Sequence, residues 1–151
     1  MQIDETDQQI IASLVEDARA SYAEIGTRVA LSAPAVKRRV DRLRAGKVIR
    51  GYTAIIDPAA LGWTTEAFVE LFCTGRTTPG QLRAAARRHP NVVGAYTVSG
   101  EADALVHLRA ADISGLEQAL ERLRAEPFVT STRSLIVLSR LVESAPAPPS
   151  G

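Results

Sequence analysis

Two helix-start signals lie close together near the N-terminus and leave the chain little conformational choice. The first is Ser21-Tyr-Ala-Glu24, a capping box in which the side chain at each end satisfies a free backbone N–H. The second is Ser32 followed by Pro34, and proline suits the first turn of a helix because the N–H that it lacks has no partner there. Ala30-Leu31 is then left as a tight connection. This spacing predicts two short helices joined by a sharp turn, the first of about ten residues.

The second of these helices is amphipathic, with an outer face that is almost purely cationic. At 100° per residue, Val36, Val40 and Leu43 share one stripe. The basic side chains of the same segment point away from that stripe, except Arg39, which lies on its flank. Residues 36–50 have a net charge of +6, although the whole chain has only +1. A tight pair of helices with a basic second member is typical of the helix-turn-helix motif.

A further helix precedes this pair, and a strand is expected after it. Asp4 is a good N-cap, and the apolar residues that follow recur at helical spacing from Ile10 to Ala18. Gly46 is expected to end the basic helix. Residues 48–57 are rich in strand-forming residues and close at Pro58. We therefore expect a winged-type helix-turn-helix domain over 1–50 and a strand linker over 51–64.

The remainder alternates as β-α-β-β-α-β, the order of the ferredoxin-like fold. Its first strand places Ala67, Val69 and Leu71 on one face, and Asp112 is expected to cap its second helix. The fold class is thus α+β, with the ferredoxin-like domain over 65–143 and a disordered Pro- and Ala-rich tail over 144–151. The expected strands and helices cover 67–73, 77–89, 92–99, 104–109, 112–123 and 129–142.

One face of such a sheet lies under its helices and the other is open. The open face of this sheet is expected to carry several apolar side chains, namely Phe68, Phe72, Leu105, Leu135 and Val137. Apolar faces of this kind are usually covered by another subunit. The pattern therefore favours a homo-oligomer.

Composition narrows the class of protein further. Cys73 is the only cysteine, so an internal disulfide is excluded and a zinc cluster is nearly so. His89 sits at a helix end and His107 is more simply read as packed than as catalytic. We find no phosphate-binding loop or nucleophile elbow, and we expect no metal and no cofactor. The absence of a signal peptide or an apolar run long enough for a bilayer predicts a cytoplasmic protein without a membrane partner.

Three stretches resemble the Lrp/AsnC family, the leucine-responsive or feast/famine regulators. They are DETDQQIIASLVEDARASYAEIG, LSAPAVKRRVDRLRAGKVIRGYTAIIDPAALG and VSGEADALVHL, and the likeness runs from about Asp4 to Val142. The resemblance implies a transcriptional regulator that binds double-stranded DNA. It also implies an amino-acid effector bound between sensor domains, and homodimers that assemble to octamers or other higher oligomers.

The DNA-binding residues are predicted from the geometry of the motif, in which the N-terminal part of the second helix enters the major groove. The residues expected nearest the base edges are Pro34, Ala35, Lys37 and Arg38. Ser32, the N-cap residue before them, belongs to the same predicted site. Arg39, Arg42 and Arg44 are expected on phosphates. The alternative is a solvated basic helix face without a partner.

The turn between the two central strands is the candidate effector site. On the residues alone, Gly100-x-x-Asp103 is most simply a hairpin turn, with glycine for a positive φ and aspartate for a side-chain-to-backbone bond. The family resemblance instead implies that backbone N–H groups near Ser99, Gly100, Glu101 and Ala102 meet a carboxylate, and that Asp103 meets an α-amino group. Thr130 and Thr132 are further candidates for the same pocket.

Two other functions stay open at this stage. Sirohaem decarboxylases resemble the same two-part architecture, although this chain has only two histidines with which to surround a tetrapyrrole. An architectural DNA-wrapping protein without an effector is the other alternative.

Overall fold

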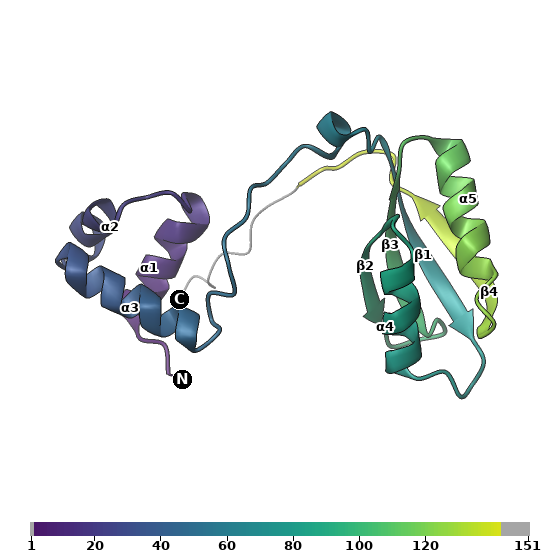
Figure 1. The fold of residues 1–151 in the computed structure, drawn as a ribbon, viewed down its shortest axis with the longest axis horizontal. Coiled ribbons are helices and arrows are strands. Elements are labelled where there is room, and N and C mark those ends of the chain that lie inside the picture. The colour runs from purple at the N-terminus through teal and green to yellow at the C-terminus, as the bar shows by residue number, and fades with distance from the viewer. Residues whose placement is uncertain (1, 143–151) are drawn as a thin grey trace. The chain divides into compact units, whose positions relative to one another are not determined.

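The computed structural model describes residues 2–142. Within them the chain divides into two compact units, one ending at Ala54 and the other running from Ile55 to Leu141. Each unit has its own hydrophobic core, and each is described by itself (Figure 1).

The N-terminal unit is a bundle of three helices: α1 (Glu5–Glu16), α2 (Tyr22–Val29) and α3 (Ala33–Ala45). Its core is formed by five side chains with no exposed area, namely Ile10, Ile25, Val36, Val40 and Leu43. The three that come from α3 are the stripe predicted from helical spacing. The predicted helix-turn-helix is therefore confirmed, because the apolar stripe of its second helix anchors it against the other two.

The helix starts confirm the predicted capping box and show another at the predicted N-cap Asp4. Ser21 and Glu24 form the predicted box at α2, and Asp4 forms a second one with Asp7 at α1. Ser32 takes the N-cap position of α3 as expected, but its side chain makes no capping hydrogen bond. Pro34 occupies the first turn of α3, where proline was predicted to be tolerated.

The turn between α2 and α3 folds tightly back on α2. Ala30 adopts the left-handed conformation at φ 54°, which costs a non-glycine residue energy. Gly26, inside α2, lies where an added Cβ would come within 2.4 Å of the Leu31 carbonyl oxygen. The close approach of the turn to α2 thus depends on the missing side chain of Gly26.

Helix α3 ends in a Schellman motif. Gly46 ends the helix as predicted, but with an ordinary φ of −77°, and the left-handed residue is Lys47 at φ 56°. The Lys47 N–H donates to the Arg44 carbonyl at 3.0 Å, and the Val48 N–H donates to the Leu43 carbonyl at 2.9 Å. These bonds satisfy the last carbonyls of the helix.

The prediction of a strand over 48–57 is wrong for this chain. The part of the chain described here has no regular structure over 50–57, and a short 3-10 helix follows at Pro58–Leu61. The valine, isoleucines and tyrosine of this segment favour a strand, but a strand also needs a neighbour to satisfy its backbone groups. The N-terminal unit offers no strand among residues 2–54, and the sheet of the other unit is complete without one.

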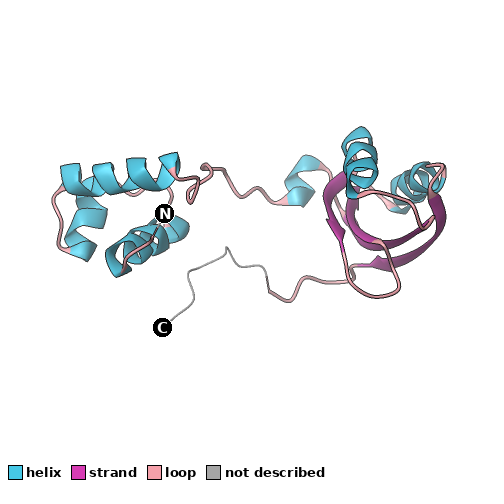
Figure 2. Cartoon of the chain, turned by 90° about the horizontal axis from the view of Figure 1, so that it is seen from below, coloured by secondary structure: helices cyan, strands magenta, loops and turns pink. Residues whose placement is uncertain are grey.

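The C-terminal unit confirms the predicted ferredoxin-like order. It comprises β1 (Thr65–Cys73), α4 (Pro79–Arg88), β2 (Val92–Thr97), β3 (Ala104–Ala110), α5 (Ile113–Arg124) and β4 (Val129–Ile136). The strands form one antiparallel sheet in the order β2-β3-β1-β4, and both helices lie on the same face of it (Figure 2). The last strand ends at Ile136 rather than at 142.

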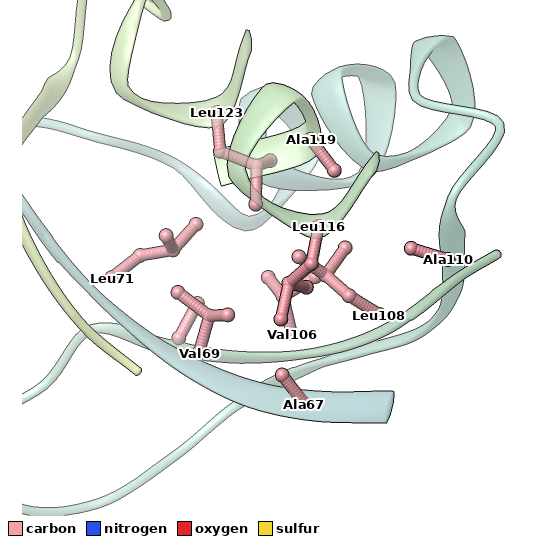
Figure 3. Close-up of a cluster of buried hydrophobic side chains, with 10 residues drawn as sticks. Ala67, Val69, Leu71, Val106, Leu108, Ala110, Leu116, Ala119 and Leu123 are labelled. Carbon is pink, nitrogen blue, oxygen red and sulfur yellow. The ribbon is translucent and has the colours of Figure 1, made fainter. Parts of the chain in front are cut away.

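Helix α5 and the two central strands build the core of this unit. Alternate residues of β1 and β3 point toward the helices, among them Val69, Leu71 and Leu108. Leu116 and Leu123 reach down from α5 onto them (Figure 3). Helix α4 contributes much less, because its only fully buried residue is Ala85.

The opposite face of the sheet carries the expected apolar side chains among charged ones. Phe68 stacks on His107, with ring centroids 4.5 Å apart, so His107 is packed as predicted. Leu135 is 56% exposed. Glu70 pairs with Arg133, whose guanidinium lies over the Phe72 ring. No helix of the described unit covers this face.

Two predictions concern other parts of the chain. The disordered tail at 144–151 lies outside the described residues. Among residues 2–142, no helix is long and apolar enough to span a bilayer.

Candidate DNA-binding helix and effector-binding turn

The N-terminal end of α3 presents small and apolar groups. Ser32 and Pro34 are exposed and Ala35 is half-buried. Because the Ser32 hydroxyl oxygen accepts no N–H of its own helix, it is available to an external hydrogen-bond donor. This end of the helix can approach a surface closely.

The cations of α3 fall into two classes. Arg38 and Arg44 are exposed, and within the described chain neither forms an ion pair. Lys37 is also exposed, but its ammonium group lies 2.6 Å from the Asp41 carboxylate, one helical turn along. The pKa of Lys37 is raised by this hydrogen bond and by the negative charge of Asp41.

Arg39 and Arg42 both bind carboxylates of α1, although the Arg42 side chain stays 48% exposed. Arg39 donates to Asp4 at 2.7 Å and to Asp7 at 2.9 Å, and Arg42 donates to the other oxygen of Asp7. The Asp7 side chain has no exposed area, whereas the Arg39 side chain is 28% exposed. Arg39 was predicted on the flank of the helix, and the structure confirms this. Both arginines were also expected on phosphates, and that contact would compete with these ion pairs.

This four-residue cluster, which we call the Asp7 cluster (Asp4, Asp7, Arg39 and Arg42), fixes α3 to the start of α1. The hydrogen bond from Arg39, followed by the backbone N–H of Asp7, holds the pKa of Asp4 below its ordinary value. Burial of a carboxylate is tolerated when it is paired and hydrogen-bonded. Asp7 was not among the predicted site residues. The available signal was the matching three-residue spacing of the two acids and the two arginines.

Two further cations extend the basic surface beyond the helix. Lys47 and Arg50 are exposed and were counted in the charge of the segment without being assigned to the site. They lie just past the Schellman motif, so their backbone positions are set by the end of α3.

The candidate effector turn has the conformation that its sequence predicts. Gly100 has a φ of +118°, which favours glycine. The Asp103 carboxylate accepts the Cys73 N–H at 2.7 Å, and the Asp103 N–H donates to the Leu71 carbonyl at 2.9 Å. The side-chain-to-backbone bond that was predicted exists, but it reaches across to β1 instead of closing the turn.

Thr130 and Asp103 both bind the Phe72–Cys73 peptide of β1, but from opposite sides. The Thr130 hydroxyl donates to the Phe72 carbonyl at 2.8 Å on the β4 side, whereas Asp103 accepts the Cys73 N–H on the β3 side. A bulge between Phe72 and Cys73 places Thr130 there. Thr132 is paired with Leu71 on the helix side of the sheet, and its oxygen accepts from Arg124 at 3.0 Å.

The other members of the candidate site differ in exposure. Ser99, Gly100 and Glu101 are exposed, whereas Ala102 is buried with 7% exposure. Burial, together with the Asp103 carboxylate, raises the pKa of the Cys73 thiol. A raised thiol pKa keeps Cys73 protonated and makes it a poor nucleophile.

Known protein families match both the N-terminal and the C-terminal unit. Residues 3–44 match the AsnC-type helix-turn-helix domain, and residues 66–147 match the Lrp/AsnC ligand binding domain. The chain belongs to the Lrp/AsnC family of transcriptional regulators.

Individual Lrp/AsnC proteins resemble the chain over nearly its whole length. The HTH-type transcriptional regulator Rv2324 of Mycobacterium tuberculosis is 53% identical over 144 residues, which is 95% of this chain and 97% of that protein. The feast or famine regulatory protein Rv3291c of M. tuberculosis, solved with L-methionine, superposes with a TM-score of 0.90 at 33% identity and covers 98% of this chain and 100% of its own. The regulator NMB0573 of Neisseria meningitidis, also solved with L-methionine, superposes with a TM-score of 0.90 at 26% identity over 97% of both chains.

Proposed function

We propose that this Lrp/AsnC protein binds double-stranded DNA sequence-specifically through α3 and regulates transcription in response to an amino acid. The observation that carries the proposal is the outer face of α3, where Arg38 and Arg44 are exposed beside Pro34 and Ala35 and form no ion pair with any residue of 2–142. The small N-terminal residues let the helix approach base edges, and the unpaired guanidinium groups supply bidentate donors for guanine or phosphate.

The contacts divide by position along α3. Ser32, Pro34, Ala35, Lys37 and Arg38 lie toward the N-terminal half, which enters the major groove in this motif. We expect phosphate contacts from Arg44, Arg42 and Arg39, and the last two would share their charge with Asp7. Lys47 and Arg50 extend the same surface. We therefore expect Arg38 to influence sequence preference and Arg44 to act mainly through charge.

The test uses duplexes selected by the full-length protein from a random DNA library, compared with scrambled duplexes of the same length. Arg38→Gln should weaken binding to the selected duplex by about 1–3 kcal/mol and relax its sequence preference. Arg44→Gln should weaken both duplexes alike and reduce the slope of log K against log salt by about one phosphate contact.

Arg19→Gln is the matched control, because Arg19 is an exposed arginine outside α3 and should change neither measurement. Equal affinity of the wild-type protein for selected and scrambled duplexes at every salt concentration would overturn the sequence-specific role.

A homodimer is the expected DNA-binding unit, assembling further to an octamer or another higher oligomer. The open face of the sheet supports it, since Leu135 is 56% exposed and Tyr96 is 57% exposed there. Ile55, before β1, is 82% exposed and would also be covered by a second copy. Two helix-turn-helix units would then meet half-sites roughly 34–36 Å apart. Sedimentation velocity of the full chain measures the assembly directly.

The effector proposal rests on the turn at Ser99–Ala102 and on Asp103, whose carboxylate lies at the end of β1. Thr130, on the β4 side of the same peptide, is a weaker member of the proposed set. L-Methionine is bound in two of the similar structures named above, and an amino acid offers a carboxylate for backbone N–H groups and an ammonium for Asp103. Thr132 lies on the other side of the sheet and is the weakest member of the proposed set.

Calorimetry of the full chain against a panel of amino acids, including L-methionine, tests this. Asp103→Asn should weaken the best ligand at least about tenfold, because a charged hydrogen bond is lost while the Asn oxygen still accepts the Cys73 N–H. Glu117→Gln, which alters an exposed carboxylate on α5, is the control. No heat with any amino acid, together with intact selective DNA binding, would leave an architectural or effector-independent DNA-binding role.

A further inference from the structure

Helix α4 does not fill the space above the sheet. A hollow of about 540 Å³ lies between α4, the edge strand β2 and the C-terminal end of α5. Its floor is formed by Leu71, Ala104 and Val106, which come from the two central strands. Ligand pockets in proteins fall in the same range of volume.

The hollow exists because small side chains occupy positions where larger ones would pack. Ala85 and Ala86 are the α4 residues above the floor, and Ala104 lies below them. Under α5, by contrast, Leu116 packs in the core cluster of the two central strands. The walls are completed by apolar groups, among them Leu82, Val92, Val93 and Phe128. The interior therefore suits an apolar chain or ring.

The rim of the hollow is cationic. Arg83 and Arg87 line it from successive turns of α4, are exposed, and form no ion pair within the described residues. No aspartate or glutamate occurs anywhere in residues 71–100. Elsewhere in the same unit arginines are paired with acids, as in Arg124 with Glu121 and Arg133 with Glu70.

The only acidic side chain in the lining is already engaged. Glu126 accepts from Arg88 at 2.8 Å and lies 2.9 Å from the His89 ring nitrogen. An α-ammonium group would therefore find no free carboxylate in this hollow, whereas a carboxylate would find two guanidinium groups. This charge pattern differs from that of the Asp103 turn, and it disfavours a zwitterionic amino acid.

We propose that the hollow under α4 binds an apolar monocarboxylate, with its chain or ring on the Leu71–Ala104–Val106 floor and its carboxylate at Arg83 and Arg87. The guanidinium groups bind the carboxylate through charge-assisted hydrogen bonds, and burial of the apolar part supplies the remaining affinity. The site shares no residue with the proposed amino-acid site, so the inference does not rest on the proposed function.

Octanoate is the probe, titrated into the full-length protein by calorimetry and followed by methyl NMR of the wild-type chain. We expect one octanoate per subunit, with shifts at Leu82, Val93 and Val106. Octylamine has the same chain with the opposite charge and should bind at least about tenfold more weakly, because it meets two cations at the rim.

Two pairs of variants separate the rim from the interior. The double variant Arg83→Gln/Arg87→Gln should lose about tenfold or more in octanoate affinity, whereas Arg19→Gln/Arg76→Gln removes the same charge outside the hollow and should lose none. Ala86→Leu should abolish binding by filling the space. Ala84→Leu makes the same change on an exposed position of the same helix and should leave binding intact.

Three results would overturn the proposal. Octanoate, octylamine and octanol binding with equal affinity would reduce the hollow to a non-specific apolar surface. Equal effects of Ala86→Leu and Ala84→Leu would place the ligand elsewhere. A change of oligomeric state with Ala86→Leu, seen by sedimentation without ligand and without loss of octanoate binding, would make the hollow a subunit contact. Because no DNA and no amino acid enters these titrations, their failure is distinct from failure of the proposed function.

Discussion

Helices α3 and α4 are both cationic amphipathic helices, but they are held in opposite ways. Helix α3 sends three fully buried side chains into its core and ties Arg39 and Arg42 to Asp7. Helix α4 buries only Ala85 and leaves Arg83 and Arg87 without ion pairs in the described part of the chain. Net positive charge is thus common to both helices, while anchoring is not.

The difference shows what each basic face is suited to do. A helix that must match a row of bases or phosphates needs a fixed position, and the buried stripe and the Asp7 cluster supply it. A helix that covers a hollow with small residues can instead admit a ligand between itself and the sheet. Large apolar side chains beneath α3 and alanines beneath α4 decide between these outcomes.

Truncating the cores of the two helices should give the largest contrast. Leu43→Ala in α3 removes a fully buried side chain and should lower the free energy of unfolding of the N-terminal unit by about 3 kcal/mol. Leu82→Ala in α4 removes a half-buried side chain beside an existing hollow and should cost about 1 kcal/mol. Denaturation followed by far-UV circular dichroism, with Trp63 fluorescence for the C-terminal unit, measures both. Equal costs would contradict the difference in anchoring.

Disruption of the Asp7 cluster should give the next largest loss of stability. Asp7→Asn should destabilise the N-terminal unit by about 2 kcal/mol, because Arg39 and Arg42 lose a buried counter-charge. Asp41→Asn removes an exposed carboxylate that pairs with Lys37 and should cost less than about 0.5 kcal/mol. The same denaturation measurement applies. Equal free energies of unfolding for the two variants would show that the buried ion pairs of Asp7 add no more stability than the exposed pair of Asp41.

The C-terminal end of α4 provides a pH-dependent test. Burial tends to raise the pKa of Glu126, but hydrogen bonds from Arg88 and His89 outweigh it and hold that pKa below its ordinary 4.5. A lowered carboxyl pKa contributes stability that is complete above about pH 4.5 and is lost as the pH falls through the folded-state value. Glu126→Gln should therefore cost about 1 kcal/mol at neutral pH and flatten this acid loss.

The decisive measurement for Glu126 is the unfolding midpoint of the two proteins at several values of pH between neutral and acid. An unchanged slope below pH 4.5 in the variant would assign the acid sensitivity to other carboxylates. Glu66 is the first to examine, since its pKa is also lowered: burial opposes the shift, but hydrogen bonds from Arg140 and His107 outweigh it.

The smallest expected effect concerns the end of α3. Lys47 holds a left-handed φ of 56°, so Lys47→Gly should stabilise the N-terminal unit by about 0.5 kcal/mol by relieving backbone strain. Ala45→Gly, two residues earlier inside the helix, should destabilise it by about 0.5–1 kcal/mol. A higher unfolding temperature for Lys47→Gly and a lower one for Ala45→Gly would confirm the Schellman motif. A lower unfolding temperature for both variants would argue against it.

Local signals were sufficient for most of the fold. The capping box at Ser21, the proline in the first turn of α3 and the alternation along β1 each depend on neighbours within a few residues, and the structure confirms all three. The prediction of a strand over 48–57 was wrong because strand propensity depends on local sequence, whereas strand pairing depends on a distant partner. The described chain contains no partner for that segment.

The sequence alone therefore determined where the helices begin, which residues of α3 are buried, and how the sheet strands alternate, because these follow from short-range sterics and periodicity. Tertiary structure alone decided that Arg39 and Arg42 turn toward Asp7, that Asp103 and Thr130 bind opposite sides of one β1 peptide, and that alanines leave a hollow under α4. The hydrogen bonds join residues 30 or more positions apart in the sequence, and the hollow lies between separate elements. Such distances are set by packing and not by any local preference.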